Sequence, residues 1–244
     1  MKTWLPILLL LFPLHAGALE HAPYDAILKK YVHHARVSYA ELLANKDDLA
    51  NLRGYLKSLS ETDPATLSSV TARKVFWINA YNAFTIELIL QNYPVASIRK
   101  ISGPFGSPWK RDFFAINGKK MSLDDIEHGI LRKRKEFLDA RVHFALVCAS
   151  KGCPPLQSYA FSPDQLDDQL EKITHDYLTD PQKTPYDSST DKLGLISVMK
   201  WYGSDFERDA GSLWKFVKRY RPQVSEKTRI EFLPYDWSLN DAEK

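Results

Sequence analysis

Cysteine is scarce in this sequence, and the short motifs of several enzyme classes are missing. Only Cys148 and Cys153 occur among 244 residues, which excludes a small scaffold held together by several disulfides. The sequence also contains no phosphate-binding glycine loop, no dinucleotide-binding fingerprint, no G-x-S-x-G elbow and no H-E-x-x-H pair. These absences argue against several enzyme classes without naming another one.

Long hydrophobic runs and a strong charge of one sign are also absent. No stretch after residue 18 reaches the roughly 18 to 20 apolar residues of a spanning helix, so we expect no stable membrane insertion of the mature chain. The formal net charge is +3, and it falls to +2 when Lys2 is removed with the leader described below. This balance does not predict a nucleic-acid partner. The basic run 132–135 has no interleaved aromatics and is typical of a solvated helix end.

The first residues predict export. Lys2 supplies a short positive region, residues 5–14 form an apolar run, and residues 16–18 give an A-x-A cleavage site. We therefore expect a signal peptide over residues 1–18 and a periplasmic or secreted protein. No cysteine lies near the cleavage point, so a lipid anchor is not expected.

The remaining residues, 19–244, are predicted to form a single α+β domain. Their number suits one large domain, and no repeat or linker divides them. Helical spacing predicts two helices within 24–57 and further helices over 72–91, from Ser122 onward, over 166–177 and over 213–220. Predicted strands cover 95–101, 141–148 and 192–198, with a type I′ hairpin over 113–121. Because helices and strands mix without βαβ alternation, we expect a buried central helix packed on a small mixed or antiparallel sheet.

The predicted helix over 72–91 is apolar around most of its girth and must therefore be central. At 100° per residue, Asn79 and Asn82 fall inside its apolar arc. A buried amide without partners costs roughly 1 to 3 kcal/mol. Each asparagine must therefore bond either to a neighbouring loop or to a ligand. Trp77 and Tyr81 on the same helix are further candidates for ligand contact.

The helix that begins at Ser122 repeats this pattern with a carboxylate. The wheel places Glu127 on the buried side and His128 near the edge of that face. An isolated buried carboxylate is costly unless a cation or several donors hold it. His128 and the two asparagines are its expected partners, with Arg132 a more distant one. The pair predicts either a functional dyad or a purely structural ion pair.

The two cysteines permit three interpretations. In an exported protein, Cys148 and Cys153 most simply form a disulfide, and Gly152 would help the loop to double back. Alternatively, one sulfur is a nucleophile. Cys148 ends a predicted strand and begins a small-residue loop with Ser150, a setting where backbone N–H groups can surround a reacting carbonyl oxygen. Zinc, held by both thiolates and one or two histidines, is the third interpretation.

A cysteine nucleophile needs a base. His128 is the expected base, oriented by Glu127 or Asn82. His143 is less suitable, because it precedes Cys148 by five residues on one predicted strand and the two side chains would point to opposite faces.

Four sequence blocks together resemble a known family. The blocks are residues 76–83, 122–128, 143–156 and 233–240, and in this order they resemble exported bacterial members of the family called DUF547. The name records an undefined function, so the resemblance implies a domain and one composite site but no reaction. Papain- and transglutaminase-like enzymes offer only a remote architectural analogy, because their nucleophile begins a helix and precedes its histidine.

The sequence therefore predicts a polar pocket that contains Asn79, Asn82, Glu127, His128, Cys148 and Ser150, with Trp77, Tyr81, Arg132, His143 and Cys153 as additional binding candidates. The first hypothesis is thiol-dependent hydrolysis or acyl transfer on a peptide-like or cell-envelope substrate. Cys148 would attack, His128 would act as base, and Asn82 would polarise the carbonyl. The alternatives are a non-catalytic ligand- or partner-binding envelope module with a Cys148–Cys153 disulfide, and a structural envelope protein. The ligand would be a small molecule, a peptide or an envelope component, and no cofactor is expected.

Overall fold

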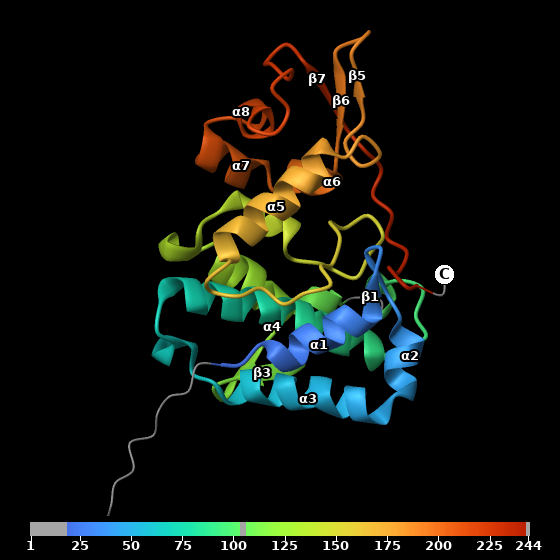
Figure 1. The fold of residues 1–244 in the computed structure, drawn as a ribbon, viewed down its shortest axis with the longest axis vertical. Helices are drawn as coiled ribbons and strands as arrows, with labels where there is room; N and C mark the ends of the chain where they lie inside the picture. The colour runs from blue at the N-terminus through green and yellow to red at the C-terminus, as the bar shows by residue number, and fades with distance from the viewer. Residues whose placement is uncertain (1–18, 103–105, 243–244) are drawn as a thin grey trace, which may run out of the picture.

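Helix α4 (Val70–Leu90) lies across the middle of the computed structural model, which describes residues 19–102 and 106–242 (Figure 1). The hydroxyl of Ser69 caps the helix by accepting from the N–H of Ala72 at 3.0 Å. Every residue from Lys74 to Leu90 is buried. The predicted central helix is confirmed. The predicted signal peptide, residues 1–18, lies outside the described residues.

Helices from the N-terminal part of the chain cover one side of α4. They are α1 (Ala22–Tyr31), α2 (Tyr39–Ala44) and α3 (Lys46–Glu61), with the short pair β1 (Val32–His33) and β2 (Arg36–Val37) between α1 and α2. The sequence predicted two helices here. The structure has three, because the side chain of Asn45 accepts from the N–H of Asp48 and starts α3 as a separate helix.

The predicted hairpin is the strand pair that contacts α4. It consists of β3 (Phe114–Ile116) and β4 (Lys119–Met121), which pair antiparallel. Asn117 and Gly118 have φ values of 47° and 73°, as a type I′ turn requires. The ring of Phe114 stacks on Phe84 of α4 with 4.0 Å between centroids. The hairpin is confirmed.

The second half of the chain forms the opposite end of the molecule (Figure 1). It contains α5 (Leu166–Thr179), β5 (Tyr186–Asp187), β6 (Lys192–Leu195), α6 (Ser197–Trp201), α7 (Gly203–Ala210), α8 (Leu213–Lys218) and β7 (Arg229–Phe232). Strand β6 is antiparallel to β5 and parallel to β7. Long helices with three small sheets make this an α+β fold, as predicted.

Two predicted strands are wrong. Residues 98–100 and 140–144 form short 3₁₀ turns. Asp139 caps the second turn by accepting from the N–H of Arg141 at 3.0 Å, and the chain beyond it is irregular. Short apolar runs do not distinguish a buried strand from other buried backbone. In the second segment the side-chain amide of Asn82, rather than a neighbouring strand, bonds to the backbone at Ala145 and Val147.

The C-terminal segment joins the two ends of the molecule. After β7 the chain runs back to lie beside β1 and α2 (Figure 1). Isolated bridges pair Leu239 with Ser150 and Asp241 with Val37. This return places the aromatic residues that follow β7 beside the loop that contains the cysteines.

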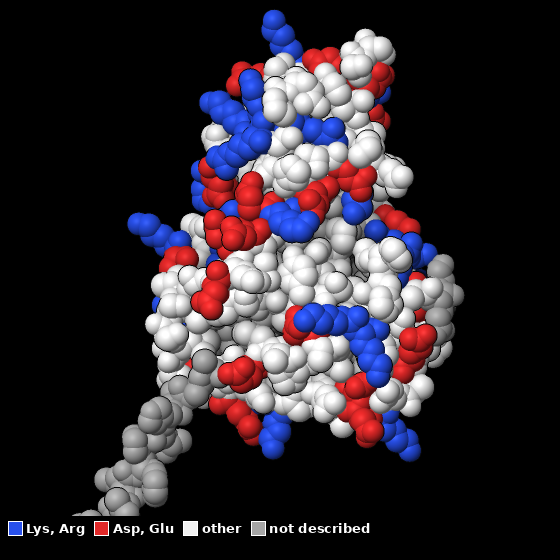
Figure 2. Space-filling model, viewed as in Figure 1, with Lys and Arg blue, Asp and Glu red and all other residues white. Residues whose placement is uncertain are grey.

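The surface in Figure 2 carries charges of both signs, with basic side chains gathered over α7 and α8 and acidic ones next to them. The last turn of α8 contributes Lys215 and Lys218 to the basic group. Over residues 19–102 and 106–242, none of the helices has the length and hydropathy that crossing a bilayer requires.

Candidate functional site

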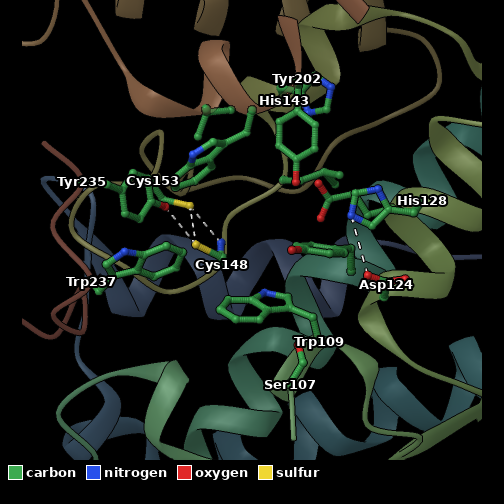
Figure 3. A pocket seen from close by; sticks show the side chains of 15 residues that line it. Ser107, Trp109, Asp124, His128, His143, Cys148, Cys153, Tyr202, Tyr235 and Trp237 are labelled. Atoms are coloured by element: carbon green, nitrogen blue, oxygen red, sulfur yellow. Dashed lines mark hydrogen bonds and ion pairs between the residues drawn. The ribbon is translucent and has the colours of Figure 1, made fainter. Parts of the chain in front are cut away.

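A cavity of about 230 Å³ opens where the cysteine loop, the turn after Ser122 and the aromatic C-terminal segment meet. Six of its lining residues are aromatic, and two are carboxylates. In Figure 3 the cysteines lie on one side with Tyr235 and Trp237, Asp124 and His128 lie on the opposite side, and Tyr202 and Trp109 lie between the two sides.

Asn82 of α4 holds the backbone that leads into the cysteine loop. Its Nδ2 donates to the carbonyl of Ala145 and its Oδ1 accepts from the N–H of Val147, both at 2.9 Å. These bonds hold the irregular backbone that leads directly to Cys148. The next residue, Ala149, adopts a left-handed φ of 58°, which turns the chain at the cavity wall.

The same loop is fixed from the other side by the C-terminal segment. The N–H of Lys151 donates to the carbonyl of Ser238, and the N–H of Gly152 donates to the carbonyl of Asp236, both at 2.8 Å. A Cβ on Gly152 would lie 2.7 Å from the backbone nitrogen of Asp236. Only glycine permits this approach, and it brings Tyr235 against the sulfurs.

Cys148 and Cys153 are both free in this structure, so the predicted disulfide is not formed here. Their Sγ atoms are 2.8 Å apart, and the N–H of Cys148 donates to Sγ of Cys153 at 3.1 Å. Sγ of Cys148 also lies 3.1 Å from the hydroxyl of Tyr235 and 3.6 Å from that of Ser150.

These contacts divide the charge unequally between the two sulfurs. The hydrogen bond from Cys153, supported by those from Tyr235 and Ser150, outweighs burial and lowers the pKa of Cys148 to about 7. Burial and the neighbouring Cys148 raise the pKa of Cys153 well above its ordinary value. Near neutral pH the pair therefore holds one proton on Cys153 and develops a thiolate on Cys148.

Aromatic rings enclose the sulfur side of the cavity. Tyr235 packs against Trp237 and Trp201, with centroid distances of 4.4 and 4.8 Å. Trp109 meets Trp237 edge to face at 5.9 Å. None of these aromatic residues was among the predicted site residues, although Tyr235 and Trp237 lie in the block 233–240. Their place in one of the four blocks that resemble the family was the signal that pointed to them.

The opposite wall comes from the turn after Ser122. A capping box begins this turn, because Ser122 N–H donates to Asp125 at 2.9 Å and Asp125 N–H donates to the Ser122 hydroxyl at 3.2 Å. From Asp125 to Leu131 the helix is a π-helix, η4. The wider turn presents Asp124, Glu127 and His128 together to the cavity.

His128 is not bonded to a cysteine. Its Nδ1 lies 2.6 Å from Nη1 of Arg132, and an arginine can only donate, so Nδ1 is the acceptor and the proton is on Nε2. That Nε2 lies 3.7 Å from Asp124. The nitrogen that would act as a base is therefore occupied by Arg132, which itself does not line the cavity.

Glu127 is buried as predicted, with 8% of its surface exposed. It forms no ion pair with His128 or with any other residue that the structure describes. Burial and the negative charge of Glu127 raise the pKa of Tyr202 and of Tyr81. The charge of Cys148 also raises the pKa of both tyrosines. The two tyrosines, the carboxylate and the thiols all line one cavity, as a composite site requires.

His143 lines the same cavity as Cys148. The prediction that the two side chains point to opposite faces is wrong, because residues 140–144 form a 3₁₀ turn rather than a strand. Nε2 of His143 donates to Asp205 at 2.8 Å, and its ring stacks on Tyr202 at 4.1 Å. Burial opposes the ionisation of Asp205, but His143 and Arg132 outweigh it and lower the pKa of that carboxyl.

Three of the predicted site residues on α4 do not line the cavity. Asn79 and Asn82 are buried, but neither lines the cavity. Asn79 donates to the carbonyl of Phe161 at 2.9 Å and accepts from the N–H of Phe161 at 3.0 Å. Trp77 is buried with no described hydrogen-bond partner for its Nε1. Because Asn82 lies outside the cavity lining and bonds to the backbone of the loop at both ends of its amide, it holds the backbone rather than polarising a substrate carbonyl.

No three His, Cys, Asp or Glu side chains within the described part of the chain group closely enough to hold a metal ion. The zinc interpretation of the cysteines therefore has no ligand set there.

The fold and the cavity define an α+β protein with a thiol pair at the wall of an aromatic pocket. The family described as "Protein of unknown function, DUF547" matches residues 65–178, so this segment of the chain is a DUF547 domain. The matched segment includes α4, Glu127, His128 and both cysteines, whereas Tyr202 and Tyr235 lie beyond it. No curated protein and no solved structure gives a significant match to the chain.

Proposed function

We propose that this protein is a thiol-dependent hydrolase or acyltransferase with Cys148 as its nucleophile. One observation carries the proposal. Three hydrogen-bonding neighbours lower the pKa of Cys148 to about 7, and its sulfur lies at the wall of a cavity. The thiolate is the reactive form of cysteine, and at this pKa about half of it is present at neutral pH.

The reaction proceeds through a thioester. The Cys148 thiolate attacks the carbonyl carbon of an ester, thioester or amide, and the bond to the leaving group breaks. The leaving group departs with the bonding electrons and takes up a proton from water. Water or an acceptor amine or alcohol then attacks the thioester, releases the acyl product and restores the thiolate. Under the predicted export, peptide-like or cell-envelope molecules are the substrates that the enzyme would meet.

The source of activation differs from the one that the sequence suggested. The hydrogen bonds of Cys148 go to Cys153, Tyr235 and Ser150 rather than to a histidine. Hydrogen bonds to the charged form lower a thiol pKa without an imidazolium partner. In this proposal His128, bonded to Arg132 across the cavity, takes no proton from Cys148.

A second function is favoured by the short distance between the sulfurs. The Sγ atoms lie 2.8 Å apart, and an oxidising compartment supplies disulfide donors that would convert such a pair into a disulfide. The oxidised protein would have no nucleophile. It would then act as a ligand- or partner-binding envelope module.

A thiol count combined with an acylation burst separates the two functions. We expect two free thiols in protein isolated from its native compartment without reductant, and one equivalent of nitrophenolate released rapidly from p-nitrophenyl acetate. Cys148→Ser should abolish the burst. Cys153→Ser is the matched control, in which the burst persists but requires a higher pH. The absence of any titratable thiol before reduction would overturn the catalytic proposal in favour of the binding module.

A further inference from the structure

The lining of the cavity is negatively charged. Asp124 and Glu127 contribute carboxylates, and Cys148 contributes a developing thiolate. No lysine or arginine belongs to the described lining. The Nδ1 atom of His128 is already bonded to Arg132. Arg132 lies outside this lining, against the ring of Tyr202 at 4.5 Å. The charged groups of the lining itself would repel an anionic ligand and attract a cation.

Glu127 has a hydrogen bond with Tyr202 but lacks the cationic partner that comparably buried carboxylates have. Glu87 and Asp205 are buried to the same degree, with 7% and 8% exposed. Glu87 pairs with Arg53 at 3.3 Å, and Asp205 pairs with Arg132 at 2.6 Å. Glu127 lines the cavity and is equally buried, with 8% exposed. It nevertheless has no ion pair to any described residue. Buried charges in proteins are normally paired, so the missing counter-charge is expected from a ligand.

Aromatic faces surround the same part of the cavity. Figure 3 shows Tyr202 and Trp109 on opposite sides of the space that separates Asp124 and His128 from the cysteines. A cation over an aromatic face is attracted by the ring quadrupole, most strongly where water is excluded. The ring of Tyr202 is already covered by His143 at 4.1 Å and by Arg132 at 4.5 Å, so Trp109 is the ring of the two that can offer a face to a ligand. Together with a carboxylate that has no cationic partner, it forms a site whose chemistry suits an organic cation.

We propose that the cavity binds an organic ammonium group, with Glu127 as its counter-ion and with Trp109 against its alkyl surface. The inference rests on the proposed function and names its substrate class: an acyl compound that carries a cationic amine. The ammonium group occupies the carboxylate side and the carbonyl faces Cys148 on the opposite side. At about 230 Å³, the cavity suits a small molecule or the end of a larger one.

Binding is tested with a pair of probes that differ only in charge. Choline and 3,3-dimethylbutan-1-ol have nearly the same shape, and neither is an acyl donor. Titrations followed by tryptophan fluorescence should use the full exported protein carrying Cys148→Ser, so that binding is measured independently of thiol chemistry. We expect choline to bind at least about tenfold more tightly than the neutral probe. Equal affinities would overturn the proposal.

Variants assign the effect to Glu127. Glu127→Gln should weaken choline binding about tenfold, leave the neutral probe unchanged, and keep or raise the melting temperature because it removes an unpaired buried charge. Glu87→Gln is the matched control, which should lower the melting temperature and leave choline binding unchanged. Asp124→Asn, at a more exposed position, should weaken choline binding to a smaller extent. Undiminished choline binding in both Glu127→Gln and Asp124→Asn would refute the assignment.

The two proposals fail in different ways. If choline is not preferred while the wild-type protein retains its acylation burst, the ligand class is wrong and the thiol function stands. If choline is preferred and sensitive to Glu127→Gln while no burst occurs, the cation site stands and the thiol function is wrong.

Discussion

The amides on α4 and the carboxylate of Glu127 are buried to a similar degree, but their hydrogen bonds are used differently. Asn79 and Asn82 each donate to one backbone carbonyl and accept from one backbone N–H. Glu127 faces the cavity without an ion pair to any described residue. The difference shows that burial of a polar side chain does not by itself indicate a ligand site. What separates the two groups is that the amides bond at both ends to the backbone, whereas the carboxylate, bonded to Tyr202, faces the cavity without a cationic partner.

The largest expected effect is a loss of reaction rate when a residue that lines the cavity is changed. Cys148→Ser should lower the rate of thioester formation by on the order of 1,000-fold, because a hydroxyl at this position is not ionised near neutral pH. Its free energy of unfolding should change by about 1 kcal/mol or less. Stopped-flow release of nitrophenolate and urea denaturation measure the two quantities. A large loss of stability with a retained burst would reverse the roles assigned to the two groups.

For Asn82, which holds the backbone of the cysteine loop, we expect a large effect on stability instead. Asn82→Ala should reduce the free energy of unfolding by about 3 kcal/mol, because the carbonyl of Ala145 and the N–H of Val147 both lose their buried partner. Asn51→Ala, at an exposed position of α3, is the control and should change stability by about 0.5 kcal/mol or less. Urea denaturation measures both. A cost below about 1 kcal/mol for Asn82→Ala would show that the amide does not hold this backbone.

Asp205 shows what a paired buried carboxylate contributes. Asp205→Asn should cost about 2 kcal/mol at pH 7, because Arg132 and His143 lose a charged partner. The pKa of this carboxyl is lower in the folded state, so its contribution is complete above the unfolded pKa of about 3.9 and is lost as pH falls through the folded value. The difference between wild type and variant should therefore shrink in acid.

Urea denaturation at pH 7 and near pH 3 measures this dependence. Asp167→Asn is the control, since Asp167 contacts Arg141 at 2.6 Å but is 85% exposed, and it should cost less than about 1 kcal/mol. A stability difference for Asp205→Asn that does not change with pH would contradict the assignment.

The smallest effect is expected at Tyr235. Tyr235→Phe removes one of the hydrogen bonds to Cys148, so the pKa of Cys148 should rise and alkylation at pH 6 should slow by roughly three- to tenfold. In the control Tyr186→Phe, the β5 residue Tyr186 loses its hydrogen bond to Asp191, and Cys148 should be alkylated at the wild-type rate. Iodoacetamide labelling followed by peptide mass analysis gives the rates. An unchanged rate in Tyr235→Phe would remove Tyr235 from the activation of the thiol.

Helical periodicity was sufficient to predict the inward-facing residues. It predicted α4, the burial of both asparagines and the burial of Glu127, because each depends only on the spacing of apolar residues within one element. The capping box and the type I′ turn were predictable for the same local reason. The α+β class followed from the mixture of elements.

The parts that depend on long-range contacts were not predictable. Residues 141–148 resemble a strand in composition, but the amide of Asn82 holds this backbone in an irregular path, and so the position of His143 was predicted wrongly. The π-helical turn and the hydrogen bond from Arg132 to His128 have no signature in spacing. Tyr235 and Trp237 reach the cysteines only because the C-terminal segment returns along the molecule.

The pH dependence of alkylation at each cysteine tests the central claim most directly. In reduced protein, iodoacetamide should label Cys148 first, with a rate that falls about tenfold for each pH unit below 7 and levels off above it. Cys153 should react slowly across this range. A midpoint for Cys148 at pH 8.5 or higher, which is the value of an ordinary thiol, or faster labelling of Cys153, would contradict the account.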